Sequence, residues 1–286
     1  KEPVLLPTAF PNIIVNPNQG IAVGMASNIC SFNLKEVCEA TIQFINDENV
    51  DLLEYLKAPD FSTGGSLIFN EKEMREIYET GRGSFKVRAK YNYDKKNNCI
   101  EIYEIPYTTT VEAIIESIVT LVKAGKIKDI TDVRDETDLE GLKIAIDVKK
   151  NTDVDDLMNK LYKLTPLEDS FACNFNVLIN GTPIVMGIRQ ILKEWVSFRV
   201  NCIKRITLFD IEKKSEKLHL LLGLQKILLD IDKAIRIIRN TEDDSQVIPN
   251  LMQAFGIDQV QAEFVAEIKL RNLNKKYILE RISEIE

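Results

Sequence analysis

The sequence predicts an α+β domain followed by a long, mainly α-helical projection, a coiled coil that ends in a small helical head. Helical patterns mix with short two-period strands joined by tight turns over residues 60–186, which is typical of largely antiparallel sheets. Over residues 188–240 there is no proline and one glycine, so a continuous helix there would be about 80 Å long. A polar break at residues 241–245 precedes shorter helical patterns.

The N-terminal region contains a polar stretch, residues 16–28, with a small apolar tip. Gly20 and Gly24 bracket this tip, Ile21 to Val23, and allow sharp turns and a close approach of the backbone to another group. The tip is either a buried strand of about three residues or a wedge presented to a partner. Local chemistry alone favours the buried strand.

A helix is expected to begin after Asn33, a plausible N-cap that forms a capping-box-like pair with Glu36. The apolar positions that fall on one face of this helix are Leu34, Val37, Cys38, Ile42 and Ile45.

A hairpin with one basic face is predicted further along the α+β domain. Residues 85–93 alternate with period two, residues 94–98 turn the chain, and residues 99–107 return it. The side chains predicted on the polar face of the first strand are Lys86, Arg88, Lys90 and Asn92. This face could follow a nucleic acid or could simply be solvated.

The long helical run carries a heptad-like apolar seam. Its members are Leu220, Leu224, Ile227, Ile231, Ala234 and Ile238. A core helix of a bundle is one interpretation, but the run is too long for an ordinary compact domain, which favours a projecting coiled coil. The last helical pattern, running to Glu286, is expected to be a helix that begins to return.

Composition narrows the chemistry. Five widely spaced cysteines without a Cys-x-x-Cys pair argue against a disulfide framework and fit a reducing cytoplasm. No apolar run approaches the ~18 residues that a membrane span needs. With His219 as the only histidine and no nucleotide-loop or hydrolase motif, no catalytic or metal-binding residue is assigned. The net charge of −7 opposes nucleic-acid binding unless a local surface favours it.

An ordered series of motifs nevertheless resembles the A subunit of bacterial type IIA topoisomerases, DNA gyrase and topoisomerase IV. The resemblance covers essentially the whole chain. The matching segments are Leu6-Pro-Thr8, Pro11-Asn12, Gly20-Ile-Ala-Val-Gly-Met-Ala26 with Asn28, Pro59-Asp-Phe61, Thr80-Gly-Arg-Gly83, Glu104-Ile-Pro-Tyr107, Arg134-Asp-Glu136 with Asp138 and Gly141, and Gln261-Ala262 with Leu270.

The resemblance implies an order of domains. The expected parts are the end of a DNA-gate region with a wedge loop (1–33), an α+β tower domain (34–187), a long coiled-coil helix (188–240), a helical dimerisation head (241–274) and the start of a returning helix (275–286).

The resemblance also implies a reaction, in which a tyrosine attacks a DNA phosphodiester and a second duplex passes through the break. The family nucleophile lies in an Arg-Tyr-Thr/Ser-Glu context, and none of the eight tyrosines has that context. We therefore expect the nucleophile to precede Lys1 and the chain alone to be inactive. Implied partners are double-stranded DNA, a second copy of the chain and a B subunit that supplies ATP hydrolysis and Mg²⁺ in an A2B2 assembly; no membrane partner and no cofactor in this chain are expected.

By resemblance, Ile21 is the residue that inserts between base pairs and bends the gate duplex. The other residues expected at DNA are Asn16, Asn28, Gly20, Gly24, Arg82, Arg88 and Lys90. The residues expected at the dimer contact of the head are Gln261, Phe264, Ile268, Leu270 and Leu273.

Two alternatives stay open at this point. A non-enzymatic coiled-coil scaffold would account for the acidic charge and the missing nucleophile. Within the family, the absence of a gyrase-type wrapping domain leaves gyrase and topoisomerase IV open, with a lean to topoisomerase IV.

Overall fold

The computed structural model describes residues 5–269, 280 and 283. The chain divides into two compact units, Lys1–Arg199 and Val200–Glu286, which are described separately. Two residues predicted at the dimer contact, Leu270 and Leu273, lie outside the described residues. The same holds for the returning helix predicted over 275–286, of which only residues 280 and 283 are described, and both are helical.

The first unit contains a five-stranded antiparallel sheet in the order β1-β2-β9-β4-β3. Its strands are β1 (Asn18–Ala22), β2 (Met25–Ile29), β3 (Ser66–Ile68), β4 (Arg82–Arg88) and β9 (Glu168–Asn174). A separate two-stranded hairpin follows β9 and consists of β10 (Asn176–Ile179) and β11 (Thr182–Val185).

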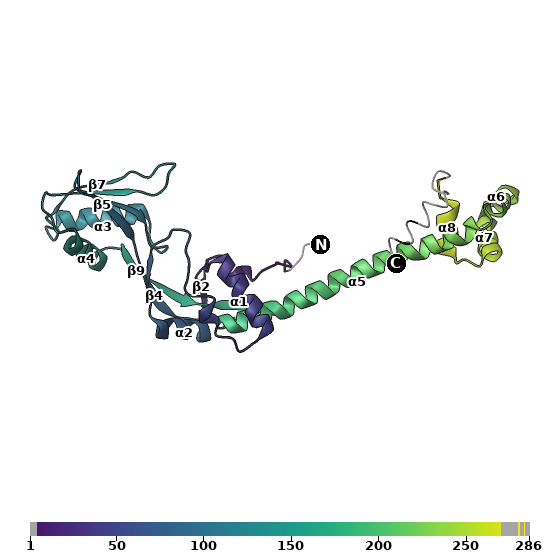
Figure 1. The fold of residues 1–286 in the computed structure, drawn as a ribbon, viewed down its shortest axis with the longest axis horizontal. Coiled ribbons are helices and arrows are strands. Elements are labelled where there is room, and N and C mark those ends of the chain that lie inside the picture. Colours follow the sequence, from purple (N-terminus) through teal and green to yellow (C-terminus); the bar gives the residue numbers. More distant parts are fainter. Residues whose placement is uncertain (1–4, 270–279, 281–282, 284–286) are drawn as a thin grey trace. The chain divides into compact units, whose positions relative to one another are not determined.

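The same unit contains a second, four-stranded antiparallel sheet in the order β5-β6-β8-β7. Its strands are β5 (Lys90–Asp94), β6 (Cys99–Glu104), β7 (Ile130–Asp135) and β8 (Ile144–Val148). Two helices, α3 (Val111–Lys123) and α4 (Val154–Leu164), lie beside this sheet (Figure 1) and share its apolar core. The mixed α+β class predicted for this region is therefore confirmed.

The predicted strand over residues 85–93 is divided in the structure. Its two halves are β4 and β5, which belong to different sheets, and the chain changes sheet at Ala89. The Ala89 amide donates to the Leu167 carbonyl at 2.7 Å, so the backbone stays bonded while it crosses. Period-two alternation continues through such a crossing, which is why the pattern predicted one strand.

Helix α1 (Leu34–Asn46) begins as predicted, because the Asn33 side chain accepts a hydrogen bond from the Lys35 amide. Its buried face differs from the prediction. The buried residues are Val37, Ala40, Thr41 and Phe44, whereas Leu34, Ile42 and Ile45 are exposed. The expected capping-box partner Glu36 bonds the Lys57 amide instead.

Helix α2 (Glu71–Thr80) ends at Gly81, which has φ of 72°. A Cβ atom at this position would lie 2.3 Å from the Met186 carbonyl oxygen, so the turn requires glycine for both conformation and space. The short 3₁₀ helices of the chain are η1 (Asn12–Ile14), η2 (Leu52–Glu54) and η3 (Asp244–Gln246).

The helix predicted over residues 188–240 is interrupted. Helix α5 (Ile188–Leu228) ends before Leu229, and α6 (Ile231–Asn240) begins after Asp230, whose side chain accepts from the Lys233 amide. Aspartate therefore serves as a new N-cap in the middle of the run. None of the helices in the described part of the chain has both the length and the apolar character that a membrane crossing requires.

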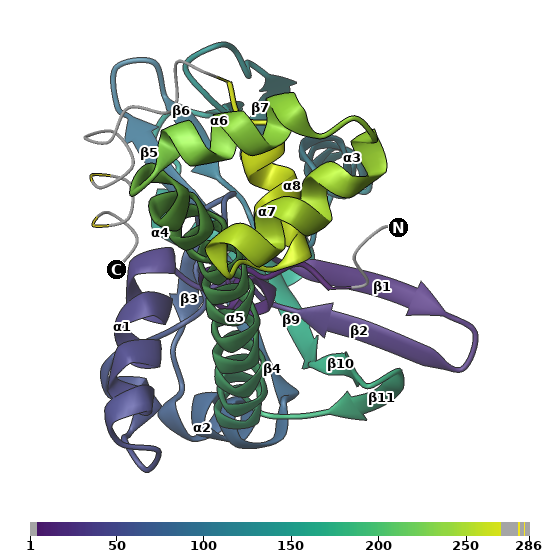
Figure 2. The ribbon, with the colours of Figure 1, turned by 90° about the vertical axis from the view of Figure 1, so that its right-hand side faces the viewer.

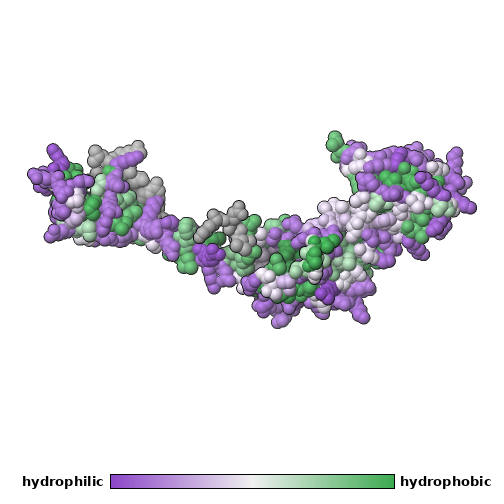
Figure 3. Space-filling view, turned by 180° about the vertical axis from the view of Figure 1, so that it is seen from behind, coloured by the Kyte–Doolittle hydropathy of each residue, from purple (hydrophilic) through white to green (hydrophobic). Residues whose placement is uncertain are grey.

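The second unit folds around its own core. Helices α7 (Val247–Phe255) and α8 (Gln259–Ala266) pack with α6 and the C-terminal part of α5. Three residues of the predicted seam, Leu224, Ile227 and Ala234, are buried in this core. Earlier on α5, apolar side chains remain at the surface (Figure 3), among them Val200, Ile203, Ile206, Leu208, Phe209 and Ile211.

Candidate nucleic-acid interface

The polar stretch at the N-terminus forms the β1–β2 hairpin, with an exposed apolar tip. Ile21 pairs with Ala26 across the hairpin, and Gly24, with φ of 84°, helps close the turn. The Ile21 and Val23 side chains are 86% and 104% exposed. The buried strand that local chemistry favoured is therefore wrong, because the strands extend beyond the core.

The β1–β2 hairpin is joined to the rest of the sheet by side-chain amides. Between β2 and β9 the only paired position in the ladder is Asn28 with Asn174. The Asn28 amide donates to the Ala172 carbonyl at 2.6 Å, and the Asn174 amide donates to the Ala26 carbonyl at 2.7 Å. These bonds hold the two strands together where the backbone ladder ends.

This bonding gives Asn28 a role in positioning the hairpin, in addition to the phosphate or sugar contact that was expected. Asn16 is exposed just after η1, and its backbone amide donates to the Asn12 carbonyl at 3.0 Å. A Cβ atom at Gly20 or Gly24 would meet no atom within 4 Å, so neither glycine is required by crowding inside this chain.

The β10–β11 hairpin lies beside β2 and projects on the same side of the first unit as the β1–β2 hairpin (Figure 2). The Ser27 hydroxyl donates to the Asn176 carbonyl at 2.9 Å, and the Asn176 amide donates to the Ala26 carbonyl at 3.3 Å. The position of this hairpin beside β2 was not predicted from the sequence. The sequence feature that could have drawn attention to this hairpin is the run of residues 171–188, which contains no charged side chain.

The predicted basic face is largely neutralised. Lys86 and Arg88 both form ion pairs with Glu168, the first at 2.9 Å. Lys90, which lies in the other sheet, forms an ion pair with Glu104 at 2.8 Å. These residues are therefore not three free cations along one strand.

The carboxylates respond to these partners. Burial opposes ionisation of Glu168, but hydrogen bonds from Lys86 and Arg88 lower its pKa below the ordinary value. Burial likewise opposes ionisation of Glu104, whose pKa is lowered by hydrogen bonds from Lys90 and the Gly65 amide. Both glutamates thus remain charged and hold their cations at neutral pH.

Arg82 differs from the other predicted cations. It is exposed and stands directly opposite Asn174 in the β4–β9 ladder, in line with Asn28 of β2. No ion pair involves Arg82 among the side chains that the structure describes. It is the predicted cation best able to meet a phosphate near the β1–β2 hairpin.

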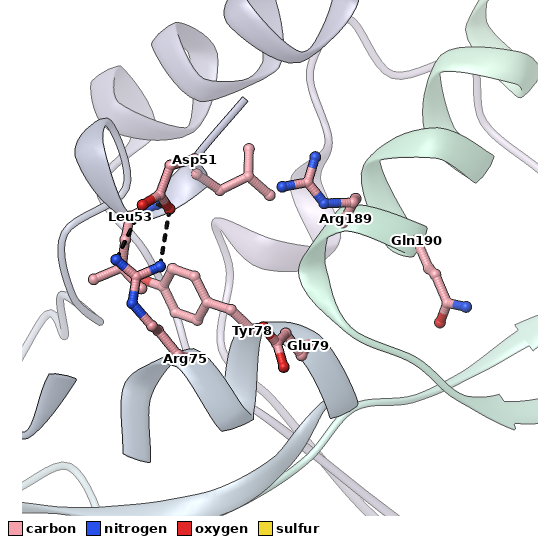
Figure 4. A pocket seen from close by; sticks show the side chains of 8 residues that line it. Asp51, Leu53, Arg75, Tyr78, Glu79, Arg189 and Gln190 are labelled. Atoms are coloured by element: carbon pink, nitrogen blue, oxygen red, sulfur yellow. Dashed lines mark hydrogen bonds and ion pairs between the residues drawn. The ribbon is translucent and has the colours of Figure 1, made fainter. Parts of the chain in front are cut away.

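A cavity of about 260 Å³ lies elsewhere in the first unit (Figure 4). Two arginines line it, but Arg75 is bonded to Asp51 at 3.0 Å and to Glu71, and Arg189 donates to backbone carbonyls of residues 48 and 50. Both guanidinium groups are therefore already bonded within this chain, Arg75 to carboxylates and Arg189 to backbone carbonyls, and no function is assigned to the cavity. Across the described residues, no cluster of histidine, cysteine and carboxylate side chains could hold a metal ion.

In the second unit, Gln261 is buried rather than displayed. Its amide donates to the His219 carbonyl at 2.7 Å, and its backbone and side chain form a capping box with Asp258. The His219 ring nitrogen lies 2.5 Å from the Asp258 carboxylate. Gln261 is thus committed inside the unit, whereas Phe264 and Ile268 are partly buried at its surface.

Comparisons with known proteins agree on one family. Residues 1–286 match the family model for the A subunit of DNA gyrase/topoisomerase IV. The DNA gyrase A subunit of Clostridium acetobutylicum is 40% identical over 279 residues, covering 96% of this chain and 34% of the relative. The corresponding protein of Borreliella burgdorferi is 36% identical over 290 residues, covering 99% of this chain and 36% of the relative.

The DNA gyrase A subunit of Ureaplasma parvum is 38% identical over 279 residues, which cover 96% of this chain and 33% of that protein. The chain therefore spans about a third of the length of these relatives. All three relatives are gyrase proteins, and the family model covers topoisomerase IV as well, so the lean toward topoisomerase IV gains no support.

Proposed function

Because the chain belongs to the family of DNA gyrase and topoisomerase IV A subunits, we propose that it is part of the DNA breakage–reunion subunit of an ATP-dependent type II topoisomerase. The complete enzyme passes one duplex through a transient double-strand break in another. A B subunit supplies ATP hydrolysis and Mg²⁺ in an A2B2 assembly. The enzyme acts on the nucleoid in the cytoplasm.

The role of this chain is to bind and bend the gate duplex. The observation that carries this proposal is the exposed, uncharged β1–β2 tip with Ile21 at 86% exposure. An apolar side chain that enters a base step costs a few kcal/mol of unstacking, which added contacts along the bent duplex offset. Asn16, Asn28 and Arg82 contribute contacts to sugar and phosphate.

Replacing Ile21 tests this role. In the full-length protein bound to its B partner, Ile21→Ala should reduce bending of the gate duplex and lower DNA cleavage. The thermal unfolding midpoint should stay unchanged, because the Ile21 side chain makes little contact with the fold. Fluorescence distance measurement across a labelled duplex reports the bend.

Leu139→Ala is the matched control, since Leu139 is also an exposed apolar residue, at 108%, in the turn between β7 and β8. Bending that is the same in the Ile21 variant, the Leu139 variant and the unmodified enzyme would exclude the wedge.

The predicted division of the chain follows from the same proposal. Residues 1–33 end the DNA-gate region, residues 34–187 form the tower, and α5 belongs to a coiled coil. The helical head, with Phe264 and Ile268 at its surface, forms the exit-gate contact with a second copy. Partial exposure of these apolar side chains supports a dimer contact there.

The chain alone should not cleave DNA. Among the tyrosines that the structure describes, Tyr78 donates to the Leu56 carbonyl and Tyr162 donates to the Ala89 carbonyl. Burial raises the pKa of Tyr162 to about 12, which makes the phenol a poorer nucleophile. Tyr277 lies outside the described residues.

Denaturing gels after incubation with supercoiled plasmid should therefore show no covalent complex with the 286-residue chain. A tyrosine-linked DNA adduct on this chain would contradict the proposed position of the nucleophile.

A further inference from the structure

The β10–β11 hairpin has an exposed apolar face that the fold does not use. Val177 is buried in the core of the first unit, but Leu178 is 68% exposed. Leu178 stands opposite Pro183 in the hairpin register, so the two side chains share one face. Asn180 and Gly181, with φ of 51° and 81°, form the two-residue turn at the end.

This face is adjacent to the β1–β2 hairpin. Asn176 and Leu178 lie on the same face of β10, because side chains alternate along a strand. The Asn176 side chain reaches the Ala26 carbonyl of β2, and its own carbonyl accepts from Ser27. The face that carries Leu178 is therefore the face from which β10 is fastened to β2.

The two hairpins share an unusual composition. Charged residues make up 28% of the chain, yet none occurs in residues 16–33 or 171–188. Solvated hairpins ordinarily carry charge, particularly on edge strands. Absence of carboxylates from both projections leaves a surface that does not repel a polyanion, although the chain as a whole has a charge of −7.

We propose that the β10–β11 hairpin is a second DNA-contacting finger, whose Leu178–Pro183 face packs in a groove of the duplex entered by the β1–β2 tip. This inference rests on the proposed function. A two-stranded ribbon has the dimensions of a DNA groove, and apolar side chains make favourable contacts with sugars and base edges there. Arg82, at the base of both projections, supplies a phosphate contact.

Site-specific photocrosslinking tests the finger in the full-length protein bound to its B partner. p-Benzoylphenylalanine replaces Ile21, Leu178 or Leu139 in separate preparations, and each is irradiated with a linear duplex of arbitrary sequence. Crosslinks to DNA are expected from positions 21 and 178 and not from position 139.

The outcomes separate the finger from the wedge. A DNA crosslink at position 21 with none at position 178 would overturn the finger and leave the proposed function standing. No DNA crosslink at either position would overturn both. A crosslink from position 178 to the B subunit instead of DNA would show that the face binds protein and would overturn the finger.

Two variants of opposite charge at position 178 give a second measurement, which does not depend on irradiation. Leu178→Glu should weaken duplex binding by about threefold or more at low salt, whereas Leu178→Lys should not weaken it. Leu139→Glu is the control and should leave binding unchanged. Equal affinities for the two Leu178 variants would overturn the finger.

Discussion

Glu168 determines how much positive charge β4 offers to a phosphate backbone. Its carboxylate is mostly buried and binds two cations, Lys86 and Arg88. The Arg88 guanidinium also lies 5.1 Å from the centre of the Tyr162 ring. One acidic side chain therefore neutralises the two cations of this strand face and holds them in ion pairs within the fold.

Glu168→Gln should lower stability and increase DNA affinity. Loss of the paired carboxylate should reduce the free energy of unfolding by about 1 kcal/mol at neutral pH. Because the folded pKa of Glu168 is lowered, its carboxylate stabilises the fold above the ordinary pKa and loses this effect as the pH falls through the folded value. The difference between variant and unmodified chain should therefore shrink as the pH falls below the ordinary glutamate pKa, and disappear once the pH lies below the folded pKa of Glu168.

Urea unfolding across this pH range measures the effect, with Glu140→Gln as the control because Glu140 is exposed in a turn. Duplex affinity should rise in the Glu168 variant, since Lys86 and Arg88 are released. A stability difference that stays the same at every pH would contradict the stabilising role of the ionised Glu168 carboxylate.

Individual residues were predictable where their partners are close in sequence. Asn33 was assigned correctly as an N-cap, because a cap depends on the adjacent turn of helix. The pairing of Lys86 with Glu168 spans 82 positions, and the alternation of one strand contains no information about a partner that far away. The amide bonds of Asn28 and Asn174 escaped prediction for the same reason.

At the scale of elements, Gly223 allows α5 and α8 to approach closely. A Cβ atom at this position would lie 2.6 Å from the Cβ atom of Gln261. Gln261 cannot move away freely, because its amide bonds the His219 carbonyl and its backbone caps α8. A glycine inside a helix is thus retained for packing, at a cost in helix propensity.

Gly223→Ala should consequently destabilise the second unit. Helix propensity alone would add about 1 kcal/mol of stability, but overpacking costs about 1–3 kcal/mol. We expect a net loss of stability, measured as a lower urea midpoint followed by circular dichroism. Lys214→Ala, at an exposed position of the same helix, should change the midpoint little. A higher urea midpoint for Gly223→Ala would show that Gln261 can move far enough to accommodate the added Cβ atom.

Helix existence was easier to predict than helix partners. α1 was found from its cap and its apolar spacing, yet its buried face is Val37, Ala40 and Phe44. Apolar residues occur on both sides of this helix, so periodicity cannot choose between them without the neighbouring sheet. In the same way, the row of apolar residues continues on both sides of Asp230 and predicted one helix there. In the structure α5 ends before this residue, and Asp230 is the N-cap of α6.

At the scale of the whole molecule, each unit has an apolar core of its own. The first unit contains two clusters of buried residues, one under each sheet. The second unit contains a third cluster, formed by the C-terminal part of α5 with α6, α7 and α8. The sequence predicted a separate head from the polar break at 241–245, but not that the end of the long helix belongs to its core.

Separate cores imply that the second unit can lose stability while the first keeps it. Leu251 is fully buried in the third cluster, so Leu251→Ala should cost about 2–5 kcal/mol in that unit. Hydrogen exchange followed by mass spectrometry should show faster exchange in α7 and α8, with protection of β4 and β9 unchanged. Val260→Ala, at an exposed position of α8, is the control and should leave both units protected. Equal loss of protection in β4 and in α7 would mean that the two units unfold together, and the independence of their cores would then be wrong.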